Sequence, residues 1–182
     1  MTNNVHNRIG EGLSAAAGRP VVLLDIDGVC SPMCPVDELD AAWAPWRRVS
    51  CGWNRGWVSA GLADALVALG EHADVWWCTG WESEALFYGT ELGVPTWPYL
   101  PLLNVPDQGM FKLASVIASV GDRPVWWFDD EHNDASDQWA TDRTSAGIAT
   151  VAAHIDDQRG LRADDLAAVG RWARTITTDA GA

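Results

Sequence analysis

Four short apolar runs, separated by stretches of helical periodicity, constrain the fold of this chain more than any other feature. They occupy residues 21–26, 73–79, 124–129 and 148–155. Nearly continuous apolar runs are typical of parallel strands that are covered on both faces. Strands that alternate with helices form βαβ units with right-handed crossovers. The sequence therefore predicts an α/β domain with three layers (α/β/α) around a mainly parallel, Rossmann-like sheet.

The stretches between these runs predict the helices. Apolar residues at helical spacing indicate helices over residues 62–69, 82–93, 112–121, 136–147 and 163–176. Ser59 is placed to cap the first helix and Gly93 to end the second. The Pro-rich stretch 94–103 is expected to form a short edge strand.

Length and composition indicate one globular domain. The chain has 182 residues, of which 48% are hydrophobic and 20% charged, as in ordinary folded proteins. We expect residues 20–182 to form the domain, preceded by a flexible arm over residues 1–19. No apolar run reaches the roughly 18 residues of a membrane span, and the arm has no apolar signal segment. The expected location is the cytoplasm, with no membrane partner.

The cysteines do not have the paired spacing of a zinc site. They are Cys30, Cys34, Cys51 and Cys78. Cys30 and Cys34 are close enough in sequence for a redox pair, but free thiols in a reducing compartment are the favoured interpretation.

The charge of the chain is strongly acidic, at −13. Such a balance argues against a broad basic surface for nucleic acid or anionic membrane. Eleven of the twelve basic residues are arginines, and Lys112 is the only lysine. A lone lysine in an arginine-rich set is a candidate for a specific role.

Polar residues follow three of the predicted strands directly. In a parallel sheet these positions share one edge, where ligands bind. They are Asp25, Asp27 and Gly28 after the first run, Thr79 and Gly80 after the second, and Asp129 and Asp130 after the third. Lys112 begins the helix that leads to the third.

This set of side chains suits phosphoryl transfer. Converging carboxylates repel one another unless a cation neutralises them, and a few carboxylates with room for water and phosphate suit Mg²⁺. Thr79 and Lys112 are donors for phosphate oxygens. A carboxylate such as Asp25 can attack phosphorus. A second carboxylate two residues later, Asp27, can act as general acid and base.

The ordered motifs "DIDGV", "CTG", the lone Lys112 and "FDDE" resemble those of the haloacid dehalogenase (HAD) superfamily of phosphohydrolases over residues 20–155. Within it, "WCTGWESEA" and "WFDDE" are most similar to HAD domains associated with RNA-repair proteins. The resemblance implies an aspartyl-phosphate on Asp25, acid–base catalysis by Asp27, and Mg²⁺ held by Asp25, the Asp27 carbonyl and Asp130, with Asp129 beside it. Thr79, Gly80 and Lys112 hold the phosphoryl group.

One position departs from that pattern. Nucleic-acid phosphatases of the superfamily often carry Arg after the glycine of the second motif, where this chain has Trp81. One phosphate contact is therefore either missing or supplied from elsewhere, and Trp81 itself is a candidate for substrate binding.

Residues 29–58 interrupt the alternation of strands and helices. The resemblance implies that they form a flap over the active site, too small for a full cap domain, and hence a site open to bulky substrates. Arg47, Arg48 and Arg55 are candidate substrate contacts. The segment also holds four tryptophans: Trp43, Trp46, Trp53 and Trp57. For most of these residues the favoured interpretation is that the tryptophans pack the flap onto the body and the arginines neutralise local acids.

Three functions stand at this point. The first is a Mg²⁺-dependent phosphomonoesterase for phosphorylated nucleic-acid ends or nucleotides. The second is a protein or small-metabolite phosphatase, which the acidic charge favours because a polyanion must approach against it. The third is a catalytically silent binding or regulatory protein, disfavoured because both Asp25 and Asp27 are present.

Overall fold

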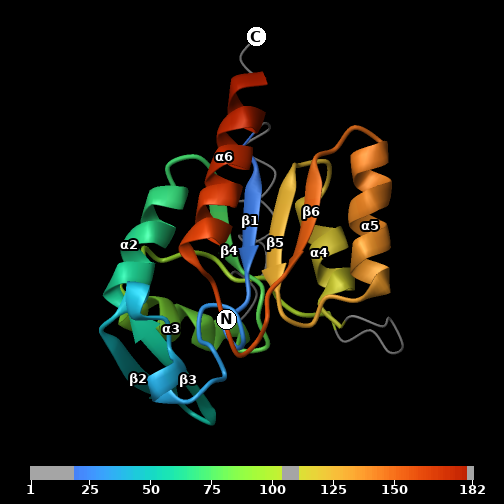
Figure 1. Cartoon of the computed structure of the whole chain (residues 1–182). Helices are drawn as coiled ribbons and strands as arrows, with labels where there is room; N and C mark the ends of the chain where they lie inside the picture. Colours follow the sequence, from blue (N-terminus) through green and yellow to red (C-terminus); the bar gives the residue numbers. More distant parts are fainter. Residues whose placement is uncertain (1–18, 104–110, 180–182) are drawn as a thin grey trace, which may run out of the picture.

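A computed structural model describes residues 19–103 and 111–179 (Figure 1). The main sheet contains β1 (Val21–Leu24), β4 (Asp74–Trp77), β5 (Val125–Asp129) and β6 (Thr150–His154). A separate hairpin contains β2 (Trp46–Cys51) and β3 (Asn54–Ser59). The helices are α2 (Ala60–Leu69), α3 (Ala85–Leu92), α4 (Leu113–Val120), α5 (Asp134–Ser145) and α6 (Ala163–Asp179). Short 3₁₀ turns lie at Val36–Glu38, Ala41–Trp43 and Glu82–Glu84.

The four-stranded sheet is parallel throughout, in the order β4-β1-β5-β6. β1 is central, with Leu24 paired to Trp77 of β4 on one side and to Phe128 of β5 on the other. After β1, the next strand of the main sheet is β4, on one side of β1. After β5, the next strand is β6, which lies in the opposite direction across the sheet. The strand order therefore reverses between β1 and β5, and such a reversal opens a crevice at the carboxyl ends of the strands. The α/β class and the parallel sheet are as predicted.

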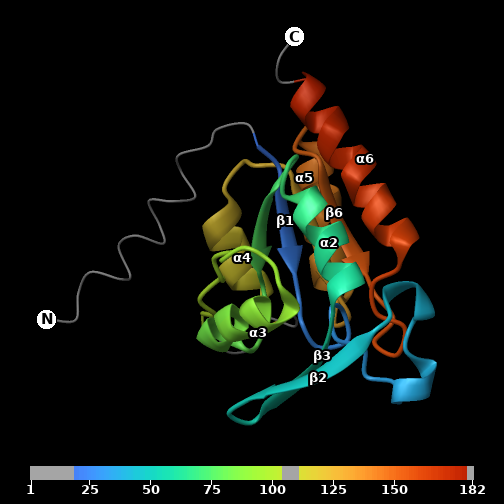
Figure 2. The same cartoon turned by 90° about the vertical axis from the view of Figure 1, so that its left-hand side faces the viewer.

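Alternate residues of β1 lie in two separate apolar cores, one on each face of the sheet. Val22 and Leu24 pack with α2, α3 and α6, whereas Val21 and Leu23 pack with α4. This burial on both faces explains why the strands read as continuous apolar runs. Figure 2 shows α2 and α6 on one side of the sheet and α4 on the other.

Helix boundaries follow local capping chemistry. The Ser59 hydroxyl accepts a hydrogen bond from the Leu62 backbone N–H at the start of α2, and Gly93 ends α3 in the left-handed conformation at φ 99°; both were predicted. α5 begins two residues earlier than expected, because Asn133 and Ser136 form a reciprocal capping box.

The Pro-rich stretch departs from its predicted strand. Only one bridge forms, between Tyr99 and Trp77 at the β4 edge. The backbone N–H of Leu100 donates to Trp77 and the Pro98 carbonyl accepts from it. Prolines lack the N–H that a longer ladder needs, so the segment lies at the expected edge but is not a regular strand.

The segment over residues 29–58 contains a loop with two 3₁₀ turns, followed by the β2–β3 hairpin, which lies at the carboxyl end of the sheet (Figure 2). Its buried face contributes Val49 and Val58 to the core. The Ser31 hydroxyl accepts a hydrogen bond from the Trp57 backbone N–H at 2.9 Å, and the Tyr88 hydroxyl donates to the Trp57 carbonyl at 2.8 Å. These bonds fix the hairpin to the loop that follows β1 and to α3.

All four cysteines are free thiols. Among the described residues, none of the helices is long and apolar enough to cross a membrane. The predicted arm, residues 1–19, lies outside the described residues except for Arg19.

Candidate functional site

Three carboxylates meet where the strand order reverses. Asp25 follows β1, Asp129 ends β5, and Asp130 comes next. One oxygen from each lies within 4.8 Å of the others. Asp25 is buried because the backbone there still follows the sheet: its N–H donates to the Phe128 carbonyl at 3.1 Å. The sequence predicted this convergence from the ends of the two apolar runs.

Lys112 lies between two of these acids. Its ammonium donates hydrogen bonds to the carboxylates of Asp25 and, at 2.8 Å, of Asp129. The Lys112 side chain is only 1% exposed, whereas lysine side chains normally lie at the protein surface. A buried ammonium is tolerated only with such partners. The single lysine of the chain is therefore a component of the acidic centre.

Asp129 is completely buried and accepts hydrogen bonds on both oxygens. Oδ2 accepts from Lys112 and, at 3.1 Å, from the Trp127 indole N–H. Oδ1 accepts from the Glu131 backbone N–H at 3.0 Å. Trp127 belongs to the apolar run 124–129, which indicates only a buried strand at the level of sequence, so this bond was not predicted. The available signal was spacing, because residues two apart on a strand share one face.

Gly28 allows the loop after β1 to approach Asp130 closely. Gly28 has φ +69°, and a Cβ at that position would lie 2.6 Å from the Asp130 carboxyl carbon. Any other residue would meet both steric contact and an unfavourable backbone conformation. The glycine of the first motif thus makes room for the acid of the last.

Asp27 is not one of the three clustered carboxylates, although its side chain interacts electrostatically with Asp25 and Lys112. Its Oδ2 accepts a hydrogen bond from the Trp81 indole N–H at 2.9 Å. Trp81 is 4% exposed and packs edge-on against Tyr88, with ring centroids 5.4 Å apart. Trp81 was a candidate for substrate contact, but in the structure it orients Asp27. Nothing in the sequence spacing indicated this pair, which is 54 residues apart.

The second motif lies at the same edge of the sheet. Thr79 follows β4 and is buried, and its hydroxyl accepts weakly from the Trp81 backbone N–H at 3.4 Å. Gly80 is exposed, with open space around the position of a Cβ. Both residues lie at the carboxyl end of β4, on the same edge of the sheet as Asp25.

Three acids at this edge of the sheet, Asp27, Asp129 and Asp130, have raised pKa values. Burial and the charge of Asp25 raise the pKa of Asp129 to about 7 and that of Asp130 to about 6. Burial also raises the pKa of Asp27, against the opposing hydrogen bond from Trp81. Burial alone would lower the pKa of Lys112, but the carboxylates of Asp25 and Asp129 outweigh it and raise that pKa. Lys112 is therefore a fixed cation.

The donor set fits a Mg²⁺ ion. It offers carboxylate oxygens alone, close together and partly open to solvent, and excess negative charge that a cation would relieve. Asp129 already accepts from three donors, whereas Asp130 is half-buried beside the Gly28 turn. We therefore expect Asp25 and Asp130 to be the direct ligands and Asp129 to orient Lys112.

The residues after Asp130 have structural roles. Asn133 caps α5. His132 is buried, with its ring nitrogens 3.0 Å from the Ser136 hydroxyl and from the Trp127 carbonyl. Glu131 is more distant, 3.9 Å from the Lys112 ammonium, and its side chain is 57% exposed.

The candidate arginines of the hairpin divide into two groups. The Arg47 guanidinium donates to the Glu91 side chain at 2.8 Å and to its backbone carbonyl at 2.7 Å, so it ties the hairpin to α3. Arg48 lies over the Trp57 ring, 4.7 Å from the centroid. Arg55 is exposed on the neighbouring strand. Arg47 thus neutralises a local acid, as expected for most of these arginines, whereas Arg55 forms no ion pair among the described residues.

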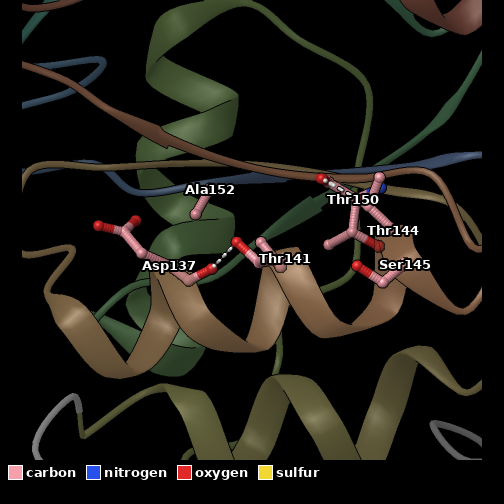
Figure 3. A pocket seen from close by; sticks show the side chains of 7 residues that line it. Asp137, Thr141, Thr144, Ser145, Thr150 and Ala152 are labelled. Carbon is pink, nitrogen blue, oxygen red and sulfur yellow. Dashed lines mark hydrogen bonds between the residues drawn. The ribbon is translucent and has the colours of Figure 1, made fainter.

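A shallow hollow between α5 and β6 is separate from this site (Figure 3). Its lining hydroxyls bond within the fold: Thr144 donates to the Thr150 carbonyl, and Thr141 donates to the Asp137 carbonyl. The hollow holds none of the acidic residues described above and offers no comparable chemistry.

Comparison with protein-family models, with curated proteins and with solved structures gives no match.

Proposed function

We propose that the protein is a Mg²⁺-dependent phosphomonoester hydrolase that works through an aspartyl-phosphate on Asp25. The observation that carries the proposal is the buried bridge of Lys112 between Asp25 and Asp129 at the reversal of strand order. A structural ion pair needs one acid for one lysine. Here a single ammonium serves two acids, and a third lies within 4.8 Å. This leaves excess negative charge that a metal cation would neutralise, and a bound Mg²⁺ would in turn accept a phosphate oxygen as a ligand.

The roles follow from the positions. The Asp25 carboxylate attacks phosphorus, and the bond to the ester oxygen breaks while Asp27 transfers its proton to that oxygen. Asp27 then takes a proton from water, the water oxygen attacks phosphorus, and the bond to Asp25 breaks to release phosphate. The raised pKa of Asp27 suits a residue that must hold a proton before it gives one.

The remaining polar groups bind and orient. Lys112 and Thr79 neutralise and hold the non-bridging phosphate oxygens. Asp25 and Asp130 hold Mg²⁺, which supplies charge neutralisation at the phosphoryl oxygens when bound. The parallel sheet with its acidic centre at the strand reversal is consistent with a Rossmann-like, HAD-like fold, and the β2–β3 hairpin with a flap in place of a large cap.

The expected substrates are phosphorylated nucleic-acid ends or nucleotides. The specific observation is the aromatic and basic hairpin beside the site, a kind of surface that suits a base and its phosphates. Protein or small-metabolite phosphomonoesters are the alternative, favoured by the net charge of −13.

Hydrolysis of p-nitrophenyl phosphate, with Mg²⁺ and after chelation, tests the proposal. We expect turnover with Mg²⁺ that chelation abolishes and that Asp25→Asn reduces to background. Turnover that persists in Asp25→Asn would show that a group other than Asp25 is the nucleophile. A folded protein inactive toward a panel of phosphomonoesters would support the binding or regulatory alternative.

A further inference from the structure

The hairpin is rich in basic and aromatic residues, although the protein as a whole is acidic. Residues 46–59 contain three arginines, three tryptophans and no Asp or Glu. The whole chain carries −13, so these three arginines leave −16 on the remainder. Segregation of this kind places the positive charge where it can act on one ligand.

The strand register gives the hairpin two unlike faces. Val49 pairs with Gly56, and both are buried against the body. On the opposite face Arg48 pairs with Trp57, and Ser50 pairs with Arg55. This second face, defined by Arg48, Ser50, Arg55 and Trp57, is called the outer face below. Three of its four residues are exposed and Trp57 is half-buried.

The two arginines of the outer face are available to a ligand. In the described part of the chain, no carboxylate lies within 4.0 Å of either guanidinium, in contrast to Arg47 with Glu91. Arg48 already stacks on the Trp57 ring at 4.7 Å, and a guanidinium plane offers a further stacking surface to a nucleobase. Arg55 is diagonal to Arg48 across the strands, a relation that separates side chains by about 7–8 Å.

Trp53 extends this surface at the hairpin turn, where its side chain is 99% exposed. The largest apolar side chain is seldom left wholly in water, and exposed tryptophan is characteristic of binding surfaces. The expectation that the tryptophans of residues 29–58 pack onto the body holds for Trp43, which is buried, but not for Trp53.

The hairpin is tied to the loop that follows Asp25. The Trp57 backbone N–H donates to Ser31, and Ser31 in turn forms a backbone bridge with Asp27. A chain that lies along the hairpin can therefore run toward the loop that carries Asp27, two residues after Asp25.

We infer that the outer face and Trp53 form a docking surface for single-stranded nucleic acid, which directs a terminal phosphate to Asp25. Stacking accepts any base because each has a π-face, and arginines grip successive phosphates. A phosphopeptide carries one phosphate and no nucleobases, so it would leave most of the aromatic and cationic side chains of this surface without a partner. The inference assigns a substrate class to the proposed hydrolase, and it therefore rests on the proposed function.

Binding of a fluorescein-labelled octathymidylate with hydroxyl ends, followed by fluorescence anisotropy, tests the surface without turnover. A negative binding result can therefore be distinguished from a negative result in the phosphatase assay. We expect Arg55→Gln to weaken binding by fivefold or more and to reduce the salt dependence by about 0.7 in the slope of log K against log salt. Trp53→Ser should weaken binding by about fivefold or more, the loss of one stacked base.

Arg171→Gln is the matched control, because it removes the same charge from an exposed position on α6. It should change affinity by less than twofold. Equal losses of affinity in Arg55→Gln and Arg171→Gln would show that only the net charge of the protein matters, and would overturn the inference. So would the absence of oligonucleotide binding at low salt, or tighter binding of an unrelated phosphopeptide with the same dependence on Arg55.

Discussion

The ammonium nitrogen of Lys112 lies 2.8 Å from Oδ2 of Asp129, and the same nitrogen bonds Asp25. One buried cation thus joins the end of β5 to the residue that follows β1. Because both acids need this partner in the metal-free protein, Lys112 has a structural role as well as the proposed catalytic one.

Substitution Lys112→Met separates these two roles. It leaves the buried carboxylates of Asp25 and Asp129 without their cation, and breaking a buried pair costs about 3–5 kcal/mol of unfolding free energy. Urea denaturation in chelator measures the cost, and Mg²⁺ should restore part of it. Unchanged stability in Lys112→Met would contradict the buried bridge.

Substitution Trp81→Phe tests the orientation of Asp27. Phenylalanine keeps an aromatic contact with Tyr88 but removes the indole N–H that lies 2.9 Å from Asp27 Oδ2. We expect kcat/KM for an alkyl phosphate to fall about tenfold, the value of one hydrogen bond to a charged group.

The loss for p-nitrophenyl phosphate should be smaller, because its leaving group needs no proton. Equal losses for both substrates would assign Trp81 to packing alone.

Substitution Gly28→Ala tests the approach of the first motif to Asp130. The added methyl group would lie 2.6 Å from the Asp130 carboxyl carbon, at a backbone with φ +69°. We expect a loss of about 1–3 kcal/mol in unfolding free energy and weaker Mg²⁺ binding by calorimetry. Gly80→Ala is the control for stability, since open space surrounds that position, and it should fall within about 0.5 kcal/mol of the parent.

The raised pKa of Asp130, about 6, predicts how stability depends on pH without metal. Between its unfolded value of 3.8 and about 6, the folded protein holds this proton more tightly than the unfolded chain does. Asp130 therefore destabilises the fold increasingly as pH rises through this window.

In chelator, Asp130→Asn should be at least as stable as the parent at pH 7, with the difference disappearing near pH 4. In Mg²⁺ the order should reverse at pH 7, because the parent binds the ion more tightly. Denaturation at both pH values, with and without Mg²⁺, measures the effect. A parent that stays more stable than Asp130→Asn in chelator at pH 7 would contradict this assignment.

The sequence predicted the sheet because burial on both faces leaves a direct trace, such as the uninterrupted run that contains Val21 and Leu24. It also predicted which acids converge, since parallel strands end at one edge. It could not predict the Trp81–Asp27 hydrogen bond or the docking of the hairpin on Ser31. These depend on how segments 54 and 26 residues apart pack together, and no local pattern records that.

The central claim is that Asp25 carries the phosphoryl group, and trapping that group tests it most directly. In Asp27→Asn the water that attacks the intermediate loses its base, so the phosphorylated protein should accumulate with a nucleoside phosphate or p-nitrophenyl phosphate. Quenching the reaction and reducing with borohydride converts an aspartyl-phosphate to homoserine, which peptide mass spectrometry locates. We predict homoserine at position 25 and at no other aspartate. Phosphoryl transfer to another residue, or product release with no modification at position 25, would contradict the account.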